Sequence, residues 1–151
     1  MVRIGHISSI FHSFEGVDAG QSCSKIILVS GDDLDNKIIG LYKQTSELRR
    51  GKPVWKTRVL HGNQWRYKFI FAKASNKWAI ADQYDFFRDD YYADSSNSMS
   101  ISEMDTYSQP CPTGGMYMLF RGDKMGWQSY SKLHVNSYKG KVETMFLMYA
   151  I

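Results

Sequence analysis

The chain has 151 residues, of which 43% are hydrophobic and 23% charged, and its formal net charge is +4. This length suits one domain that can fold without stabilising disulfides or metal ions, and the composition is too apolar for a wholly disordered chain. No run of about 18 consecutive apolar residues occurs, so no membrane-spanning helix is predicted. Aromatic residues make up 15% of the chain, which favours strands and equally suits a binding surface.

Compartment is only weakly indicated by the sequence. Residues 1–14 lack the continuous apolar stretch of a secretory signal, and no Asn-x-Ser/Thr acceptor for glycosylation occurs. Both observations favour a cytoplasmic location. Cys23 and Cys111 can form one bridge if the protein is exported, whereas in a reducing compartment we expect buried thiols.

Turn signals rich in Gly, Asn, Asp and Pro recur at short intervals, and short apolar or alternating runs lie between them. We therefore predict an all-β fold, an antiparallel sandwich or barrel of about eight short strands with little helix, formed by residues 1–151 as a single domain. Residues 44–49 are expected to form a helical turn or a loop. The predicted strands are residues 25–30, 37–42, 53–60, 65–72, 77–81, 116–120, 125–129 and 142–149.

The predicted core consists of large apolar side chains from these strands. Its members are Ile27, Val29, Ile39, Trp55, Trp65 or Phe69, Phe71, Trp78 and Phe146. Within residues 65–72 the aromatic side chains at odd positions share one face, and Arg66 and Lys68 share the other, because side chains alternate along a strand.

Residues 82–113 form a long connection of different composition. Residues 82–94 are acidic and aromatic, and residues 95–102 are small and polar. A connection of this length without clear secondary structure is either functional or a plain surface loop, and the sequence leaves both interpretations open.

The charges are segregated along the chain. Residues 37–79 contain eleven Lys or Arg and one acid, whereas residues 80–110 contain one Arg and seven acids. If the two segments lie together in the fold, they neutralise each other. If they lie apart, the molecule has a basic face that attracts anions and an acidic face, and such a molecule can stack with copies of itself.

A single-strand nucleic-acid surface is one hypothesis for the basic segment, because cations can hold phosphates while aromatic rings stack on bases. The cations involved are Arg49, Arg50, Lys52, Lys56, Arg58, Arg66 and Lys68, and the rings are Trp55, Trp65 and Tyr67. Geometry speaks against it, since within residues 65–72 the cations and rings point to opposite faces.

Other chemistry is weakly indicated. Residues 31–36 place three carboxylates within four positions, but Lys37 falls where a calcium loop needs an oxygen ligand, so an Asp-rich turn is expected. Residues 121–123 spell Arg-Gly-Asp at a predicted hairpin turn. The four histidines have no metal-ligand spacing, and no local motif supports either cysteine as a nucleophile.

Four short motifs fall within residues 37–81. They are Gly40-x-Tyr42, Gly51-Lys52-Pro53-Val54-Trp55, Phe69-Ile70-Phe71 and Lys77-Trp78-x-Ile80. In this order they resemble a small β module that recurs in proteins of algae and other protists. The resemblance implies a strand-rich interaction domain, covers only this part of the chain, and brings no assigned activity or functional residue with it.

The sequence therefore predicts a non-enzymatic structural or recognition module that binds protein, including copies of itself. A glycan-binding domain is the first alternative, because exposed rings suit sugar faces, and a single-strand nucleic-acid binder is the second. No catalytic residue, metal ligand or cofactor is predicted. The side chains expected to contact the partner are Arg49, Arg50, Lys52, Lys56, Asp85, Asp89, Asp90, Tyr91 and Tyr92. Arg49 and Arg50 are expected to project from a loop tip, and Asp85 to lie outside.

Overall fold

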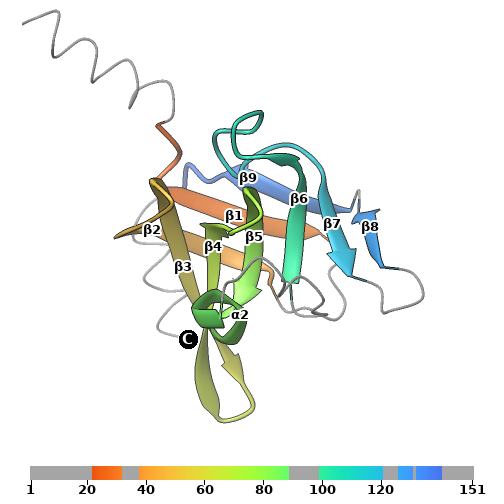
Figure 1. Ribbon diagram of the computed structural model, residues 1–151. Helices are drawn as coiled ribbons and strands as arrows, with labels where there is room; N and C mark the ends of the chain where they lie inside the picture. Colours follow the sequence, from red (N-terminus) through yellow and green to blue (C-terminus); the bar gives the residue numbers. More distant parts are fainter. Residues whose placement is uncertain (1–21, 32–37, 89–98, 121–125, 131, 141–151) are drawn as a thin grey trace, which may run out of the picture.

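A computed structural model describes residues 22–31, 38–88, 99–120, 126–130 and 132–140 of the protein. Nine antiparallel strands of this part form one sheet that curls into a half-barrel (Figure 1), so the predicted antiparallel all-β class is confirmed. The strands are β1 (Ile26–Gly31), β2 (Gly40–Arg49), β3 (Lys52–His61), β4 (Gln64–Ala72), β5 (Lys77–Asp82), β6 (Met99–Asp105), β7 (Tyr117–Phe120), β8 (Trp127–Tyr130) and β9 (Leu133–Ser137).

Strands β1 to β8 follow one another across the sheet, and β9 returns to pair with β1 at the opposite edge from β8. Two tight turns in this meander follow from local sequence. Arg50 and Gly51, between β2 and β3, have φ angles of 52° and 74°. Two successive positive angles match a type I′ hairpin turn, in which Gly is favoured and Arg is unusual. Gly62 begins the β3–β4 turn at φ 62°.

The main core fills the inside of the curled sheet, since its members come from the edge strand β9 as well as from β1 to β5 and β7. Trp55 and Trp78 are fully buried, and their ring centres lie 5.9 Å apart in an edge-to-face contact. The Trp55 indole donates to the Ser24 carbonyl at 2.9 Å, and the Trp78 indole donates to the Gln109 carbonyl at 2.7 Å. Buried Trp is stable there because its one polar group has a partner.

A second apolar cluster lies on the outer side of the central strands, beneath the short helix α2 (Gln83–Arg88). Phe86 of α2 stacks on Phe69 of β4 with ring centres 3.9 Å apart, and it meets Phe71 edge-to-face at 5.0 Å. Figure 1 shows α2 in front of β4, at the lower end of β5 and above the tip of the β3–β4 hairpin. The helix thus covers the part of this face that is nearest the body of the sheet. The end of the β3–β4 hairpin extends beyond the helix.

Cys23 and Cys111 form a disulfide across 88 residues of sequence. It joins the segment before β1 to the loop after β6. The same loop is held by hydrogen bonds from the Tyr117 hydroxyl and the Gln109 amide to the Pro112 carbonyl, at 2.6 and 3.2 Å. Of the two alternatives left open by the sequence, the bridge is the one formed.

Several element predictions need correction. Residues 44–49 are part of β2 and form neither a helical turn nor a loop. The connection 82–113 contains α2 and β6, and β9 was not predicted at all. Among the predicted core residues, Ile39 is 36% exposed while Ile38 is buried, and Phe69 rather than Trp65 is the buried member of its pair. The predicted strand 142–149, with Phe146, lies outside the described residues.

Candidate binding face

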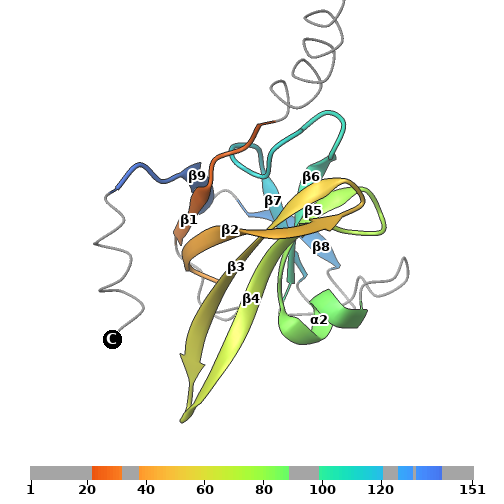
Figure 2. The same ribbon diagram turned by 90° about the vertical axis from the view of Figure 1, so that its left-hand side faces the viewer.

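The end of the β3–β4 hairpin projects from the rest of the sheet. Pairing of β2 with β3 ends at Lys56, and pairing of β5 with β4 ends at Lys68, whereas β3 and β4 stay paired as far as His61 and Gln64. Within the described sheet, residues 58–67 therefore pair only with each other. We call this segment the arm, and Figures 1 and 2 show it extending from the body in both views.

One face of the arm carries aromatic rings in contact with cations. Trp65 and Tyr67 of β4 are 45% and 38% exposed. The guanidinium carbon of Arg58 lies 4.3 Å from the centre of the Trp65 ring, and Nζ of Lys56 lies 4.0 Å from the centre of the Tyr67 ring. Lys43 of β2 is opposite Lys56 in the register and so points to the same side. We call these five side chains the basic aromatic face.

This arrangement corrects the geometric objection to a surface of mixed cations and rings. Along β4, Arg66 and Lys68 do alternate with the rings and point to the other side. The register places Arg58 of β3 opposite Tyr67, however, and Lys56 opposite Phe69. Strand β3 therefore supplies the cations that β4 cannot supply on the ring side, and one face offers both positive charge and surfaces for stacking.

A shallow hollow of about 390 Å³ opens at the base of the arm, where β2 and β3 part. Its size lies within the range of roughly 300–1,000 Å³ that is usual for ligand sites. Three cations, three polar side chains and one ring surround it. The lining residues are Lys43, Gln44, Thr45, Lys56, Thr57, Arg58 and Tyr67.

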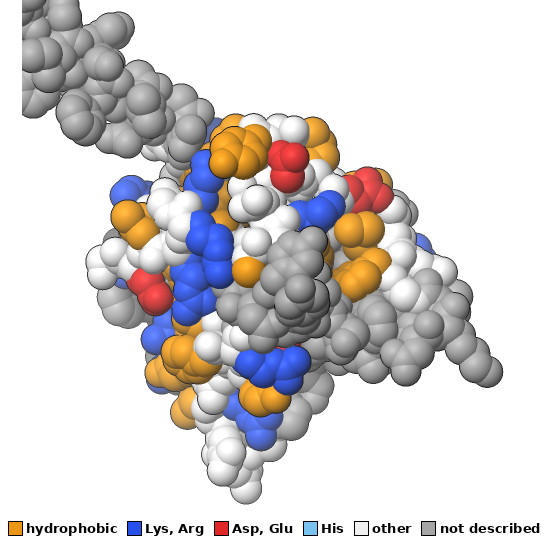
Figure 3. Space-filling model, viewed as in Figure 1, with side chains coloured by type: hydrophobic (Ala, Val, Ile, Leu, Met, Phe, Trp, Pro, Cys, Tyr) orange, Lys and Arg blue, Asp and Glu red, His pale blue; other side chains and the backbone are white. Residues whose placement is uncertain are grey.

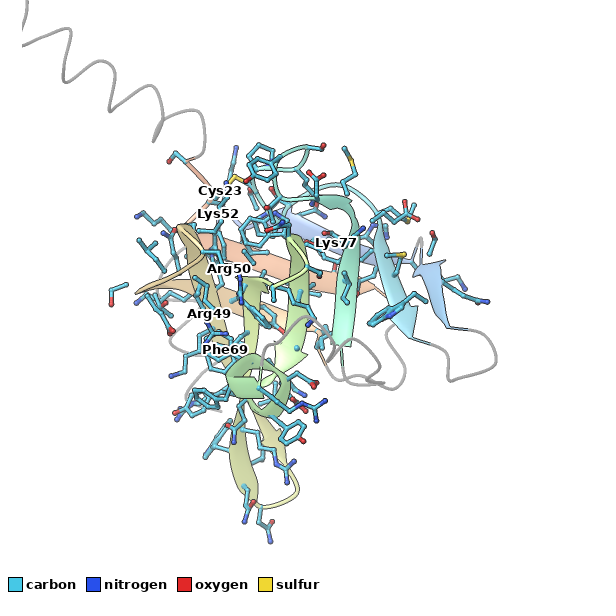
Figure 4. The ribbon with its side chains drawn as sticks, in the orientation of Figure 1. Cys23, Arg49, Arg50, Lys52, Phe69 and Lys77 are labelled. Atoms are coloured by element: carbon cyan, nitrogen blue, oxygen red, sulfur yellow. A yellow bond between two sulfur atoms is a disulfide. The ribbon has the colours of Figure 1, made fainter. Side chains whose placement is uncertain are left out.

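Further cations lie on the same side of the molecule. Figure 3 shows a stripe of Lys and Arg side chains on this face with hydrophobic side chains beside it, and Figure 4 labels Lys52, Arg50 and Arg49 in succession along that line. Lys52 also lines a second hollow of about 230 Å³ next to Cys23. The basic segment of the sequence therefore does form a basic surface in the described fold.

The sequence predicted that Arg49 and Arg50 project from a loop tip. Arg50 does lie exposed in the β2–β3 turn, whereas Arg49 is in β2, and both guanidinium groups donate hydrogen bonds within the fold. The guanidinium carbon of Arg49 lies 3.8 Å from the centre of the Phe86 ring, and its Nη1 donates to the Phe86 carbonyl at 2.7 Å. The Arg49 side chain is only 22% exposed. Nη1 of Arg50 donates to the Ala72 carbonyl at 2.9 Å. Both side chains fold back onto the sheet, and Arg49 fastens α2 to it.

The acidic segment supplied the other residues of the predicted site, and only one of them is among the described residues. Asp85 is 3% exposed, so the prediction that it lies outside is wrong. It sits in the first turn of α2, where the Asp82 carboxylate accepts the Asp85 backbone amide at 3.0 Å and caps the helix. Asp89, Asp90, Tyr91 and Tyr92 lie outside the described residues.

Helix α2 adds exposed rings that the sequence did not single out. Phe87 is 74% exposed and Tyr84 is 62% exposed. The Arg88 guanidinium carbon lies 5.1 Å from the Tyr84 ring centre, and its Nη1 donates to the Tyr84 hydroxyl at 2.7 Å. Phe87 contacts Phe69 edge-to-face at 6.2 Å. The cation–ring pattern of the arm thus recurs on the neighbouring helix.

Two groups with shifted pKa values lie away from this face. Hydrogen bonding from the Ser108 backbone amide holds the pKa of the exposed Asp105 carboxyl below its usual range. Burial raises the pKa of the Tyr117 hydroxyl well above its ordinary value. Both shifts follow from local structure, a turn in one case and the core in the other, so neither marks a reactive group.

In the described part of the chain, no group of three or more His, Cys, Asp or Glu side chains could hold a metal ion. No helix there is long and apolar enough to cross a membrane. No protein-family model matches the chain, and no curated protein or solved structure matches it either. A functional assignment has to come from the chemistry of the basic aromatic face.

Proposed function

We propose that the protein is a non-enzymatic recognition module and that its basic aromatic face binds an elongated anionic partner. The supporting observation is the pairing of Lys56 with Tyr67 and of Arg58 with Trp65 on the exposed side of the arm. The two pairs follow one another along the same two strands at a separation of about 7 Å. Two successive cation–ring units suit a ligand with repeating charge.

The cation–ring pairs of the basic aromatic face contribute little to the free energy of folding. A cation on an exposed ring contributes only about 0.5–1 kcal/mol. Large rings left exposed on a segment that pairs only with itself gain little from packing, whereas such rings are favoured where a partner covers them. The face is thus better suited to contact with a ligand than to holding the fold.

Removing two cations from the face tests the proposal. Binding of dextran sulfate, a strongly charged linear polymer, is measured by calorimetry at several salt concentrations. We expect the K56A/R58A double variant to bind more weakly and to show a smaller salt dependence, because fewer counterions are exchanged. The matched control is K132A/K139A, which removes the same charge near β9. Equal losses in both variants would mean that only net charge matters.

A second copy of the chain is the alternative partner. Its support is the segregation of charge, with eleven cations and one acid in residues 37–79 and seven acids in residues 80–110. The exposed Glu103 and Asp105 belong to the acidic segment. Light scattering of the purified chain should then give a mass that falls towards the monomer as salt rises. A monomer at low salt and high concentration rules out this alternative.

A further inference from the structure

The class of anionic ligand can be narrowed, if the face binds an anion as proposed. The disulfide is the first observation. Cys23 and Cys111 are the two cysteines of the chain, and they are bonded to each other. Structural disulfides persist in oxidising environments and are rare where glutathione keeps thiols reduced. The bridge thus favours a compartment outside the reducing cytosol, against the cytoplasmic location that the N-terminal sequence and the missing glycosylation acceptor favoured. In such a compartment, nucleic acid is a less available partner than surface or matrix glycans.

The chemistry of the hollow is the second observation. Gln44 brings an amide beside the cations Lys43 and Lys56. An amide both donates and accepts hydrogen bonds, as sugar hydroxyls do. The neighbouring Thr45 hydroxyl already donates to the Val54 carbonyl at 2.9 Å, so it can offer a ligand only an acceptor. The Tyr67 ring borders the same space and offers an apolar surface for the C–H face of a sugar. Hydrogen-bonding groups, a stacking ring and positive charge within one shallow hollow fit a charged sugar.

The exposed rings provide the third observation. Trp65 and Tyr67 each have a cation within 4.3 Å of the ring centre. A sugar residue that carries an anionic substituent likewise has an apolar ring face close to a negative charge. Each cation–ring unit can therefore bind one such residue by stacking and by charge together.

From these three observations we infer that the ligand of the basic aromatic face is an anionic polysaccharide, with sulfate or carboxylate groups on its sugar rings. The inference rests on the proposed function and specifies its ligand. Sulfate and carboxylate are alike in offering oxygen anions to Lys and Arg. Arg58 favours either through its planar fork of donors, and Lys43 and Lys56 act as point charges.

The test compares four polymers with the oxidised full chain at about 0.15 M salt. Dextran sulfate and polygalacturonate are the two anionic glycans, unmodified dextran is the neutral one, and single-stranded poly(U) is the nucleic acid. We expect at least one anionic glycan to bind about tenfold or more tightly than both dextran and poly(U). The three charged polymers are compared at equal concentration of anionic groups. The better of the two identifies sulfate or carboxylate as the preferred group.

One double ring variant and one control complete the experiment. W65A/Y67A should lose about tenfold or more in affinity for the anionic glycan. Y107A is the control, because Tyr107 is 82% exposed on a different loop. Near-equal melting temperatures show that the variants are folded. Unchanged affinity of W65A/Y67A would overturn the glycan inference, since charge alone would then explain binding.

The remaining outcomes separate this inference from the proposed function. Tighter binding of poly(U) than of either anionic glycan, with loss in K56A/R58A, overturns the glycan and leaves anion recognition by the face intact. Absence of binding to any of the three charged polymers overturns both. Binding of unmodified dextran as tight as that of both anionic glycans also overturns both, because charge would play no part.

Discussion

Two tryptophans of the same hairpin have opposite environments. Trp55, near the start of β3, is fully buried and its indole donates to Ser24, whereas Trp65, near the start of β4, is 45% exposed beneath Arg58. Both are aromatic residues in regular strands. The difference is in what surrounds each strand, because β3 at Trp55 has strands on both sides, and the arm at Trp65 pairs only with itself.

The comparison shows that burial of a ring is decided by neighbouring elements and not by the strand that carries it. In the body, rings fill the inside of the curl and exclude water. On the arm, the same residue type is covered only by a cation from the next strand. A segment that keeps large rings without a second layer has apolar surface available to a partner.

The largest expected effect is in the body. Replacing Trp78 by Ala removes a fully buried ring, its contact with Trp55 and its hydrogen bond to the Gln109 carbonyl. We expect the free energy of unfolding to fall by about 3–5 kcal/mol, as for other large-to-small core changes. Denaturant unfolding followed by fluorescence measures it. A loss below about 1 kcal/mol would contradict the assignment of Trp78 to the core.

The parts of this body that could be predicted from sequence are those with local signals. The segments that form β3, β4 and β5 are short alternating or continuous apolar runs between Gly or Asn turns, so their predicted bounds lie within one residue of the observed ones. Strand β6 was missed because its inward side chains are serines. The Ser100 hydroxyl donates to the Met118 carbonyl and the Ser102 hydroxyl to the Met104 carbonyl. Buried polar residues satisfied in this way leave no hydrophobic pattern to read.

The site was predictable only in part for a different reason. Lys56 does lie on the basic aromatic face, but its contact with Tyr67 depends on the register between two strands. That register follows from the two-residue turn at Gly62 and Asn63, so it was latent in the sequence. The contact of Arg49 with Phe86 could not be predicted from local sequence, because it depends on a helix that begins 34 residues later in the chain.

The second largest loss of stability is expected from removal of the Cys23–Cys111 disulfide. Replacing both cysteines, C23S/C111S, removes a crosslink that closes a loop of 88 residues. We expect a loss of about 2–4 kcal/mol, since the unfolded chain regains freedom. Chemical denaturation with and without a reductant measures it, and the reductant should destabilise only the wild type. If the wild type is as stable reduced as oxidised, the bridge contributes nothing to folding.

Arg49 should give an intermediate effect, because it belongs to the body although it lies at the surface. Replacing Arg49 by Ala removes a cation from the Phe86 ring and a hydrogen bond to the Phe86 carbonyl. We expect a loss of about 1–2 kcal/mol in the free energy of unfolding. Lys43→Ala, at an exposed position of the same strand, is the matched control and should change stability by less than about 0.5 kcal/mol. Equal effects would mean that Arg49 does not fasten α2.

The smallest effect on stability should come from the arm. Replacing Trp65 by Ala removes a ring that is 45% exposed, along with its contact to the Arg58 guanidinium at 4.3 Å. The lost cation–ring contact and the partly exposed area together predict a fall of no more than about 1 kcal/mol in the free energy of unfolding. The same denaturant experiment as for Trp78 measures it, so the two tryptophans are compared directly. A loss as large as that of Trp78→Ala would contradict the assignment of Trp65 to an exposed ring that is available to a ligand. A small loss of stability together with a large loss of anionic-polymer binding is the combination expected of a ring that serves recognition.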